Sequence, residues 1–238
     1  MSSKQLIELR QELKKYVRQD KKNILAKFFK TKPGEYGAGD LFLGVMVPQI
    51  RQVARKYHNL PWLQVRELQR SAWHEERLCA LLIMVNQYQA SDLAIRKIIF
   101  RHYLSSTKYI NNWDLVDLTA DRIVGQYLLD KNITILLKLA RSKNLWQRRI
   151  AILSTFAFIK KGEAQNTLRV AKILLNDNHD LIQKAVGWML REVGKRCGQK
   201  TEEEFLATYY QQMPRTMLRY AIERFPEKLR QQYLHGKI

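Results

Sequence analysis

The spacing of apolar residues is the feature that most constrains the fold of this chain. Almost every segment repeats its apolar residues with the period of an α-helix, and each ends at a short polar break. No paired segments alternate apolar and polar residues with the period of two that strands require. Pro48 and Pro61 each stand near the first turn of a predicted helix, where proline is tolerated. The sequence therefore predicts an all-α fold.

The predicted helices follow one another along the whole chain. They cover 3–18, 21–30, a helix opened by Pro48, a helix opened by Pro61, 74–89, 91–105, 113–129, 132–142, 145–160, 164–176, 178–196, 201–212, 214–224 and 226–234. Pairs of helices that recur every ~35–40 residues are typical of HEAT- or armadillo-like repeats, which stack into a solenoid. We therefore expect one all-helical repeat domain over residues 1–238.

The glycine-rich segment KPGEYGAGD, from Lys32 to Asp40, is the longest break in this pattern. It has neither the GxxxxGK[ST] pattern of a P-loop nor the GxGxxG pattern of a dinucleotide-binding fold, and no strand precedes it. We interpret it as a long connection between two helices.

Charge indicates the kind of partner. The chain has 42 lysines and arginines against 22 acidic residues, a net charge of +20. Nucleic acid is the first candidate for a polyanionic partner, and an anionic membrane surface is the second. No apolar run approaches the ~20 residues that span a bilayer. The N-terminal sequence also lacks the apolar segment of a signal peptide, so we expect a cytoplasmic protein without a membrane partner.

Cysteine and histidine give no pattern of a metal site or a disulfide framework. Cys79 and Cys197 are far apart, and no histidines pair at helical ligand spacing. Structural or surface roles are expected for His58, His74, His102, His179 and His235. No serine stands in the GxSxG pattern of a hydrolase. We expect neither a metal nor a cofactor.

One carboxylate breaks the apolar pattern of its predicted helix. In NNWDLVDLTADR, Trp113, Asp117, Ala120 and Val124 fall on one stripe, and three of these four residues are apolar. Desolvation of a carboxylate costs several kcal/mol, roughly, unless a positive charge meets it. Asp117 is therefore a candidate for stabilising a cation.

Two further helices contain similar exceptions. Arg149 interrupts the apolar face of predicted helix 145–160, whereas Arg148 points to its side. Trp188 falls on the charged side of predicted helix 178–196, beside Lys184, Arg191 and Glu192. Structural roles also fit each residue alone: a core position for Trp113, an ion pair between Asp117 and Arg149, and cover for a neighbouring helix end by Trp188. Together they place two tryptophans, a carboxylate and an arginine on three helices of a basic protein, a combination that favours function.

Four segments in the same order resemble the AlkD family of DNA alkylation repair glycosylases. They are KTKPGEYGAGDLFLGV (30–45), NNWDLVD (111–117), WQRRIAILS (146–154) and QKAVGWMLRE (183–192). The resemblance covers about residues 20 to 225. It implies a superhelical solenoid of HEAT-like repeats with a concave basic surface, which binds duplex DNA and removes positively charged N3- and N7-alkylated purines. It also implies that the lesion stays in the base stack.

The resemblance assigns roles to residues that match the family pattern. Trp113, Asp117 and Trp188 are the expected catalytic residues, and Arg149 is the expected phosphate contact. Arg148 is adjacent to Arg149, so an alignment slip of one residue would exchange them. Lys184 and Arg191 are further candidates for DNA binding. We expect a monomeric hydrolase without a cofactor.

The chemistry agrees with these roles. An alkylated purine that carries a positive charge leaves as a neutral base, so one carboxylate is sufficient and no general acid is needed. Asp117 can stabilise the cationic sugar that forms, and tryptophan faces attract a cationic base.

Two other classes of function stay open: a helical scaffold that binds nucleic acid without catalysis, and a repeat adaptor for acidic proteins. A pure DNA-binding scaffold would gain nothing from a carboxylate that faces DNA, because phosphates repel it.

Overall fold

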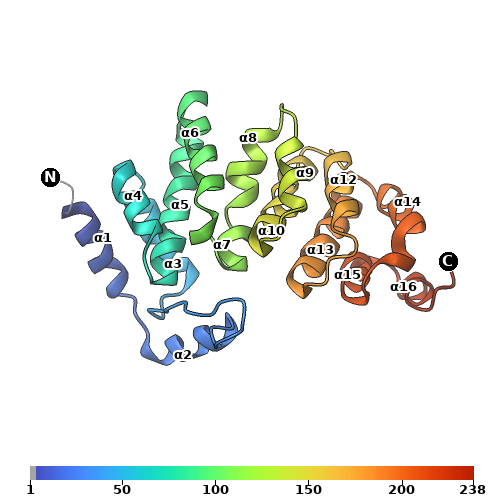
Figure 1. Cartoon of the computed structure of the whole chain (residues 1–238), viewed down its shortest axis with the longest axis horizontal. Coiled ribbons are helices and arrows are strands. Elements are labelled where there is room, and N and C mark those ends of the chain that lie inside the picture. The colour runs from blue at the N-terminus through green and yellow to red at the C-terminus, as the bar shows by residue number, and fades with distance from the viewer. Residues whose placement is uncertain (1–3) are drawn as a thin grey trace. The chain divides into compact units, whose positions relative to one another are not determined.

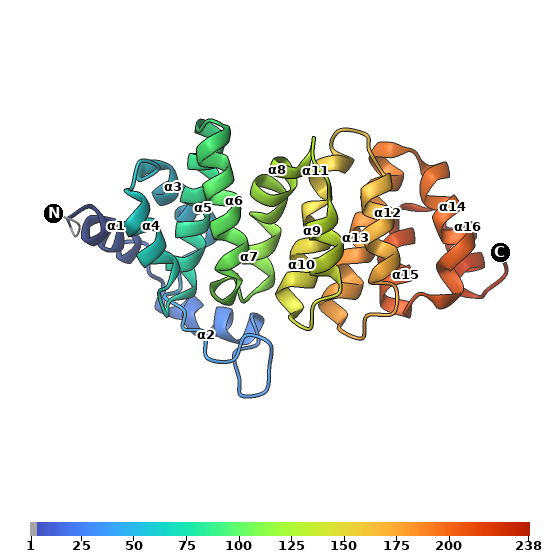
Figure 2. The same ribbon diagram turned by 45° about the horizontal axis from the view of Figure 1, so that its top comes forward.

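The computed structural model describes residues 4–238, and helices account for the regular structure of this part of the chain (Figures 1 and 2). A single isolated bridge joins Leu41 and Trp73. The contacts divide the chain into two compact units, and each is described by itself: an N-terminal unit that ends at Thr119 and a C-terminal unit, Ala120–Ile238. The predicted all-α fold class is confirmed.

The N-terminal unit contains seven α-helices among its described residues. They are α1 (Lys4–Lys14), α2 (Gln19–Phe28), α3 (Val47–Lys56), α4 (Trp62–Gln69), α5 (His74–Ala90), α6 (Leu93–Ser105) and α7 (Trp113–Asp117), with a 3-10 turn at Thr107–Tyr109. Helices α3 and α4 both pack against α5. The first predicted helix, 3–18, starts outside the described residues, and its described part ends at Lys14.

The C-terminal unit begins with a π-helical turn, Asp121–Gly125, and continues with helices only. They are α8 (Gln126–Leu128), α9 (Thr134–Ala140), α10 (Leu145–Ser154), α11 (Phe156–Ile159), α12 (Gln165–Ile173), α13 (Asp180–Cys197), α14 (Gln199–Tyr209), α15 (Arg215–Ala221) and α16 (Glu227–Leu234), with 3-10 turns at Tyr210–Gln212 and Ile222–Arg224. Helix α10 packs against α9 and α13, and α13 packs against α15. Helices that lie near one another in the sequence of this unit therefore pack against one another.

Local sequence signals begin several of these helices. Proline precedes or opens α3, α4, α15 and α16, because its fixed φ suits a first turn that needs no N–H donor. The side chain of Asp92 accepts a hydrogen bond of 2.9 Å from the amide of Ile95 and caps α6. Asn144 caps α10 in the same way, through the amides of Trp146 and Gln147.

Two long predicted helices are broken in the structure. Predicted helix 113–129 ends as an α-helix at Asp117, and predicted helix 145–160 is divided between α10 and α11. At both breaks a hydroxyl side chain bonds to a carbonyl of the preceding turn: Thr119 to Leu115, and Thr155 to Ile152. Such bonds compete with the helical hydrogen bonds and bend the chain. The prediction of continuous helices was wrong at these two places, and the threonine bonds contribute to the breaks.

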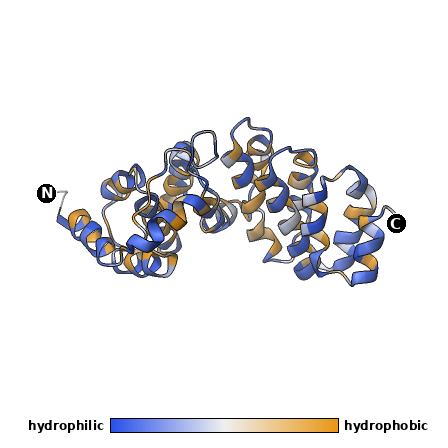
Figure 3. Ribbon diagram, turned by 90° about the horizontal axis from the view of Figure 1, so that it is seen from below, coloured by the Kyte–Doolittle hydropathy of each residue, from blue (hydrophilic) through white to orange (hydrophobic). Residues whose placement is uncertain are grey.

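Helix α5 forms the centre of the N-terminal core. Every residue from His74 to Val85 is buried, although most helices of both units also have hydrophilic faces (Figure 3). The apolar run LCALLIMV explains the burial of the later turns. The first turn is different, because it buries the ionisable residues His74, Glu75, Glu76 and Arg77. In residues 4–238, no helix combines the length and apolar character that crossing a membrane requires.

Helix α13 holds the C-terminal unit together through a close contact with α15. A Cβ atom added at Gly187 would lie 2.4 Å from the carbonyl oxygen of Met217 and 2.5 Å from Cβ of Tyr220. These distances are too short for any residue larger than glycine. The backbones of the two helices therefore meet at Gly187.

Replacement of Gly187 with alanine is expected to force α13 and α15 apart. Overpacking of this kind lowers the free energy of unfolding by about 1–3 kcal/mol, and we expect the upper part of this range because a backbone oxygen lies in the way; the gain in helix propensity of about 1 kcal/mol offsets only part of the loss. Urea denaturation measures the change. Lys195→Ala, at an exposed position of α13, is the control and should change stability by less than about 0.5 kcal/mol. A Gly187→Ala protein as stable as the wild type would contradict the close contact.

Candidate active site

The first turn of α5 buries charged groups that are each met by a partner from another segment. The carboxylate of Glu75 accepts hydrogen bonds from the amides of Leu43, Gly44 and Val45, at 2.9, 2.8 and 3.2 Å. Glu76 pairs with Arg10 of α1 at 3.2 Å. These bonds fix the segment before α3 and the middle of α1 on the first turn of α5.

His74 is the centre of a buried network that joins three segments. Its Nδ1 lies 3.2 Å from Oδ2 of Asp40, and its Nε2 lies 2.8 Å from Oδ2 of Asp114. Asp40 also pairs with Arg77 at 2.8 Å and accepts a hydrogen bond of 2.8 Å from Asn111. Burial alone would lower the pKa of His74, but the charge and hydrogen bond of Asp114, with help from Asp40, raise this pKa to about 9. His74 is therefore protonated at neutral pH and donates from both ring nitrogens.

The free energy of unfolding is expected to fall as the pH rises through about 9. The pKa of His74 is raised from 6.5 to about 9 in the folded protein, so its contribution is complete below pH 6.5 and is lost above the folded value. The shift corresponds to about 3 kcal/mol. Urea denaturation between pH 6 and pH 10 measures it. His74→Gln should lack this part of the pH dependence, and identical profiles for the two proteins would contradict the assignment.

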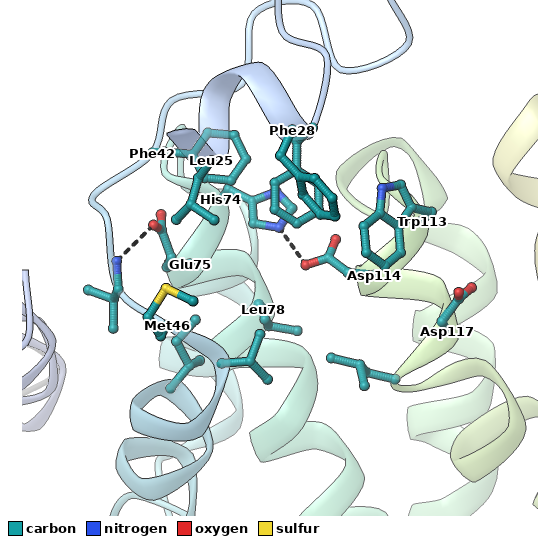
Figure 4. Close-up of a pocket in the computed structure, with 15 residues that line it drawn as sticks. Leu25, Phe28, Phe42, Met46, His74, Glu75, Leu78, Trp113, Asp114 and Asp117 are labelled. Atoms are coloured by element: carbon teal, nitrogen blue, oxygen red, sulfur yellow. Dashed lines mark hydrogen bonds and ion pairs between the residues drawn. The ribbon is translucent and has the colours of Figure 1, made fainter. Parts of the chain in front are cut away.

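A cavity of about 290 Å³ lies beside this network. Its walls come from α2, the segment before α3, the first turns of α3 and α5, and α7 (Figure 4). Leu25, Phe42, Met46 and Leu78 are among its apolar lining residues. The carboxylate of Asp114 turns toward His74 in this view. Trp113 and Asp117 of α7 belong to the same lining.

An aromatic stack connects His74 to Trp113. The ring of Phe29 stacks on Trp113, with centroids 5.2 Å apart and an interplanar angle of 25°, and on Phe42, at 5.1 Å and 13°. Phe42 stacks on His74 at 4.6 Å, and the edge of Phe28 meets Trp113 at 5.7 Å. One face of the Trp113 indole is therefore covered by Phe29.

Trp113 and Asp117 lie one turn apart on α7, as their spacing predicts. Both are half-buried. The carboxylate that the structure buries most deeply on α7 is Asp114, which is 5% exposed. The expectation of an acidic group among buried residues thus holds for this helix, but it applies more strongly to Asp114 than to Asp117.

The two candidate arginines of the C-terminal unit lie on α10 and already have partners within the protein. Arg149 is 5% exposed, and its guanidinium donates a hydrogen bond to the carbonyl of Leu181. The prediction that Arg149 interrupts a buried face is confirmed. Arg148 pairs with Asp177 at 2.6 Å and donates to the carbonyls of Ser142 and Lys143. Arg148 is half-buried beside the buried face, in agreement with the prediction that it points to the side of that face.

The remaining candidates lie on α13, which packs against α10. Lys184 pairs with Asp180 at 2.9 Å, and Arg191 pairs with Glu223. Trp188 is half-buried, and its ring lies 6.2 Å from that of Phe156. The prediction that Glu192 belongs to an exposed charged face was wrong: it is 6% exposed and bonds to Arg196 of the next turn at 3.0 Å.

The structure therefore brings the candidates together in two groups. Trp113 and Asp117 share the cavity of the N-terminal unit, and Arg148, Arg149, Lys184, Trp188 and Arg191 lie on two packed helices of the C-terminal unit. Sequence reasoning missed His74, Asp40 and Asp114. The signal for His74 was the run HEER at the start of an otherwise apolar helix, because four ionisable residues next to a buried segment need partners.

Comparisons with known proteins agree with this fold. A predicted DNA alkylation repair enzyme from Enterococcus faecalis has a similar structure, with a TM-score of 0.67 and 16% sequence identity over 89% of this chain and 97% of that chain. Comparison with curated proteins gives no match. The family described as DNA alkylation repair enzyme matches residues 9–225, which include all four segments on which the resemblance was based. The chain therefore belongs to the DNA alkylation repair enzyme family.

Proposed function

We propose that this protein is a DNA glycosylase that hydrolyses the N-glycosidic bond of cationic N3- and N7-alkylated purines in duplex DNA. Membership of the family supports a role in DNA alkylation repair. The observation that carries the finer proposal is that Trp113 and Asp117 line one cavity from the same helical face. An aromatic ring beside a carboxylate favours a positively charged substrate.

Asp117 is assigned the central chemical role. As the bond between C1′ of the sugar and the base nitrogen breaks, its electron pair neutralises the cationic base, which leaves without a proton. Positive charge develops on the sugar, and the Asp117 carboxylate stabilises it. Water then adds to C1′ and loses a proton, so the products are an abasic site and a free base. Asp117 also orients this water by accepting a hydrogen bond from it.

The two tryptophans are assigned to recognition of the cationic nucleoside. Phe29 covers one face of Trp113, so the contact uses the opposite face or the ring edge. A cation on an aromatic ring contributes about 0.5–2 kcal/mol. Trp188 of the C-terminal unit is assigned the same role. Its helix also carries Lys184 and Arg191, which would bind phosphates of the duplex.

The direct test is to incubate purified protein with duplex DNA that contains 7-methylguanine and to measure free base by chromatography. We expect release of the methylated base and accumulation of abasic sites. A protein that binds the duplex tightly but releases no base would support a non-catalytic scaffold. Weak DNA binding together with tight binding of an acidic peptide would support an adaptor.

Arg149→Ala is expected to weaken binding to damaged and undamaged duplexes alike. A lost phosphate contact flattens the dependence of log K on log salt concentration by about one unit. Fluorescence anisotropy at several salt concentrations measures both effects. Arg148→Ala is the matched comparison, because Arg148 is the adjacent candidate and its guanidinium also has a partner within the protein, Asp177, as that of Arg149 has in the carbonyl of Leu181. If Arg148→Ala alone flattens the salt dependence, the phosphate contact belongs to that residue.

A further inference from the structure

Helix α7 is too short to be stable without contacts to its neighbours. It has only five residues, Trp113–Asp117, and a turn at 118–119 separates it from the next helical segment. Isolated helices shorter than about 12–15 residues are marginally stable in water. The orientation of Trp113 and Asp117 therefore depends on side chains that anchor α7 to its neighbours.

Two anchors hold α7, one at each end. At the start of α7, one carboxylate oxygen of Asp114 accepts a hydrogen bond of 2.9 Å from the amide of Leu115. The other oxygen accepts a hydrogen bond of 2.8 Å from Nε2 of His74. Just beyond its end, the hydroxyl of Thr119 lies 2.8 Å from that of Tyr103. The first anchor is a charged pair, whereas the second joins two neutral hydroxyl groups. Asp114 of the first anchor is also adjacent to Trp113 in the sequence.

His74 is itself held from several sides. Asp40 lies against its Nδ1, and Arg77 and Asn111 fix Asp40 in turn. The rings of Phe42 and Phe29 pack on the imidazole at 4.6 and 4.9 Å. Because Phe29 also stacks on Trp113, His74 reaches α7 by two routes: the ion pair with Asp114 and the aromatic stack.

A buried ion pair is a poor means of stabilising a core, since apolar residues of similar volume often do as well. Its directional hydrogen bonds do fix geometry. We propose that His74 is a positioning residue for the reaction: clamped between Asp40 and Asp114, it holds α7 so that Trp113 and Asp117 meet the cationic nucleoside. This inference rests on the proposed glycosylase function and deepens it.

The clamp requires a protonated imidazole. Asp40 and Asp114 face the two ring nitrogens, Arg77 lies beyond Asp40, and the neighbouring carboxylate of Glu75 is occupied by backbone amides. Removal of the proton leaves one ring nitrogen as a lone-pair acceptor against a carboxylate, and that contact becomes repulsive. Excision should therefore decline as the pH rises through about 9, the pKa of His74.

The experiment measures the single-turnover excision rate of 7-methylguanine with protein in excess, beside the affinity for an undamaged duplex. His74→Gln keeps a hydrogen-bond donor but no charge. We expect excision about 10- to 100-fold slower, because a misplacement near 1 Å costs roughly 10²-fold, and an affinity changed less than about twofold. The control is His102→Gln, since the Nε2 of His102 bonds to the neutral Gln69 at 2.8 Å and not to a carboxylate; it should excise at the wild-type rate.

A double-variant cycle separates positioning from general loss of structure. If His74 acts through Asp117, the combined loss of rate in the His74→Gln, Asp117→Asn double variant should be clearly smaller than the product of the two single losses. Independent, multiplicative losses would overturn the proposal. Should His74→Gln fail to fold, Asp40→Asn provides the second measurement: with one carboxylate neutral, the alkaline decline of excision should move to lower pH. An unmoved decline would also overturn it.

The outcomes distinguish the two proposals. If the wild-type protein releases no methylated base, the glycosylase function fails and the role of His74 fails with it. If the wild type excises the base and His74→Gln does so at the same rate, with only its thermal stability lowered, then the glycosylase function stands and His74 is merely structural.

Discussion

Asp117→Asn is expected to slow release of 7-methylguanine by about 10²–10³, the typical loss when one preorganised electrostatic group is removed. The amide has nearly the size of the carboxylate, but it has no charge to stabilise the developing cation on the sugar. DNA affinity and the free energy of unfolding should stay close to the wild-type values, because Asp117 is half-buried at the edge of the core. Single-turnover kinetics with saturating protein measure the chemical step apart from binding.

Asp92→Asn is the matched control for this variant. Asp92 belongs to the same unit and is exposed, and its side chain caps α6. Asparagine caps helices about as well as aspartate does, so excision and stability should both be unchanged. If Asp117→Asn released 7-methylguanine at the wild-type rate, Asp117 would have no part in the mechanism, and the family resemblance would lose its catalytic meaning for this chain.

The second large effect concerns the charge of the lesion. Cationic purines such as 7-methylguanine and 3-methyladenine should be excised. Neutral lesions such as uracil or hypoxanthine should be released more slowly, by at least about 10²-fold, because a general acid typically contributes 10²–10⁴-fold and the proposed mechanism contains no general acid. A neutral base leaves as an anion. Close to Asp117 and the DNA phosphates, that anion is destabilised further by like-charge repulsion.

The measurement is a single-turnover panel on matched duplexes that carry one lesion each. Trp113→Leu and Trp188→Leu should lower excision of the cationic lesions and keep most of the affinity for undamaged DNA, because their assigned contact is with the charged base. Similar release rates for uracil and 7-methylguanine would show that charge is not the basis of recognition. The role assigned to the two tryptophans would then be wrong.

Local sequence patterns determined most of what could be predicted for this protein. Helical periodicity located nearly every helix, and prolines marked the starts of α3 and α4. The four-residue spacing of Trp113 and Asp117 put both on one face of α7, where they line the same cavity. Such features depend on backbone geometry within one or two turns, so a single sequence is enough to reveal them.

Only the tertiary structure decided where the buried charges meet. His74 bonds to Asp40, which lies 34 positions before it in the sequence, and to Asp114, which lies 40 positions after it. No local pattern connects these three residues. The breaks in predicted helices 113–129 and 145–160 also depend on packing. Gly125, near the first break, lies so close to α10 that a Cβ there would be 2.2 Å from the carbonyl oxygen of Ser154. A sequence fixes local hydrogen-bond geometry by itself, whereas the pairing of distant charges and backbones is set by the burial that the whole fold provides.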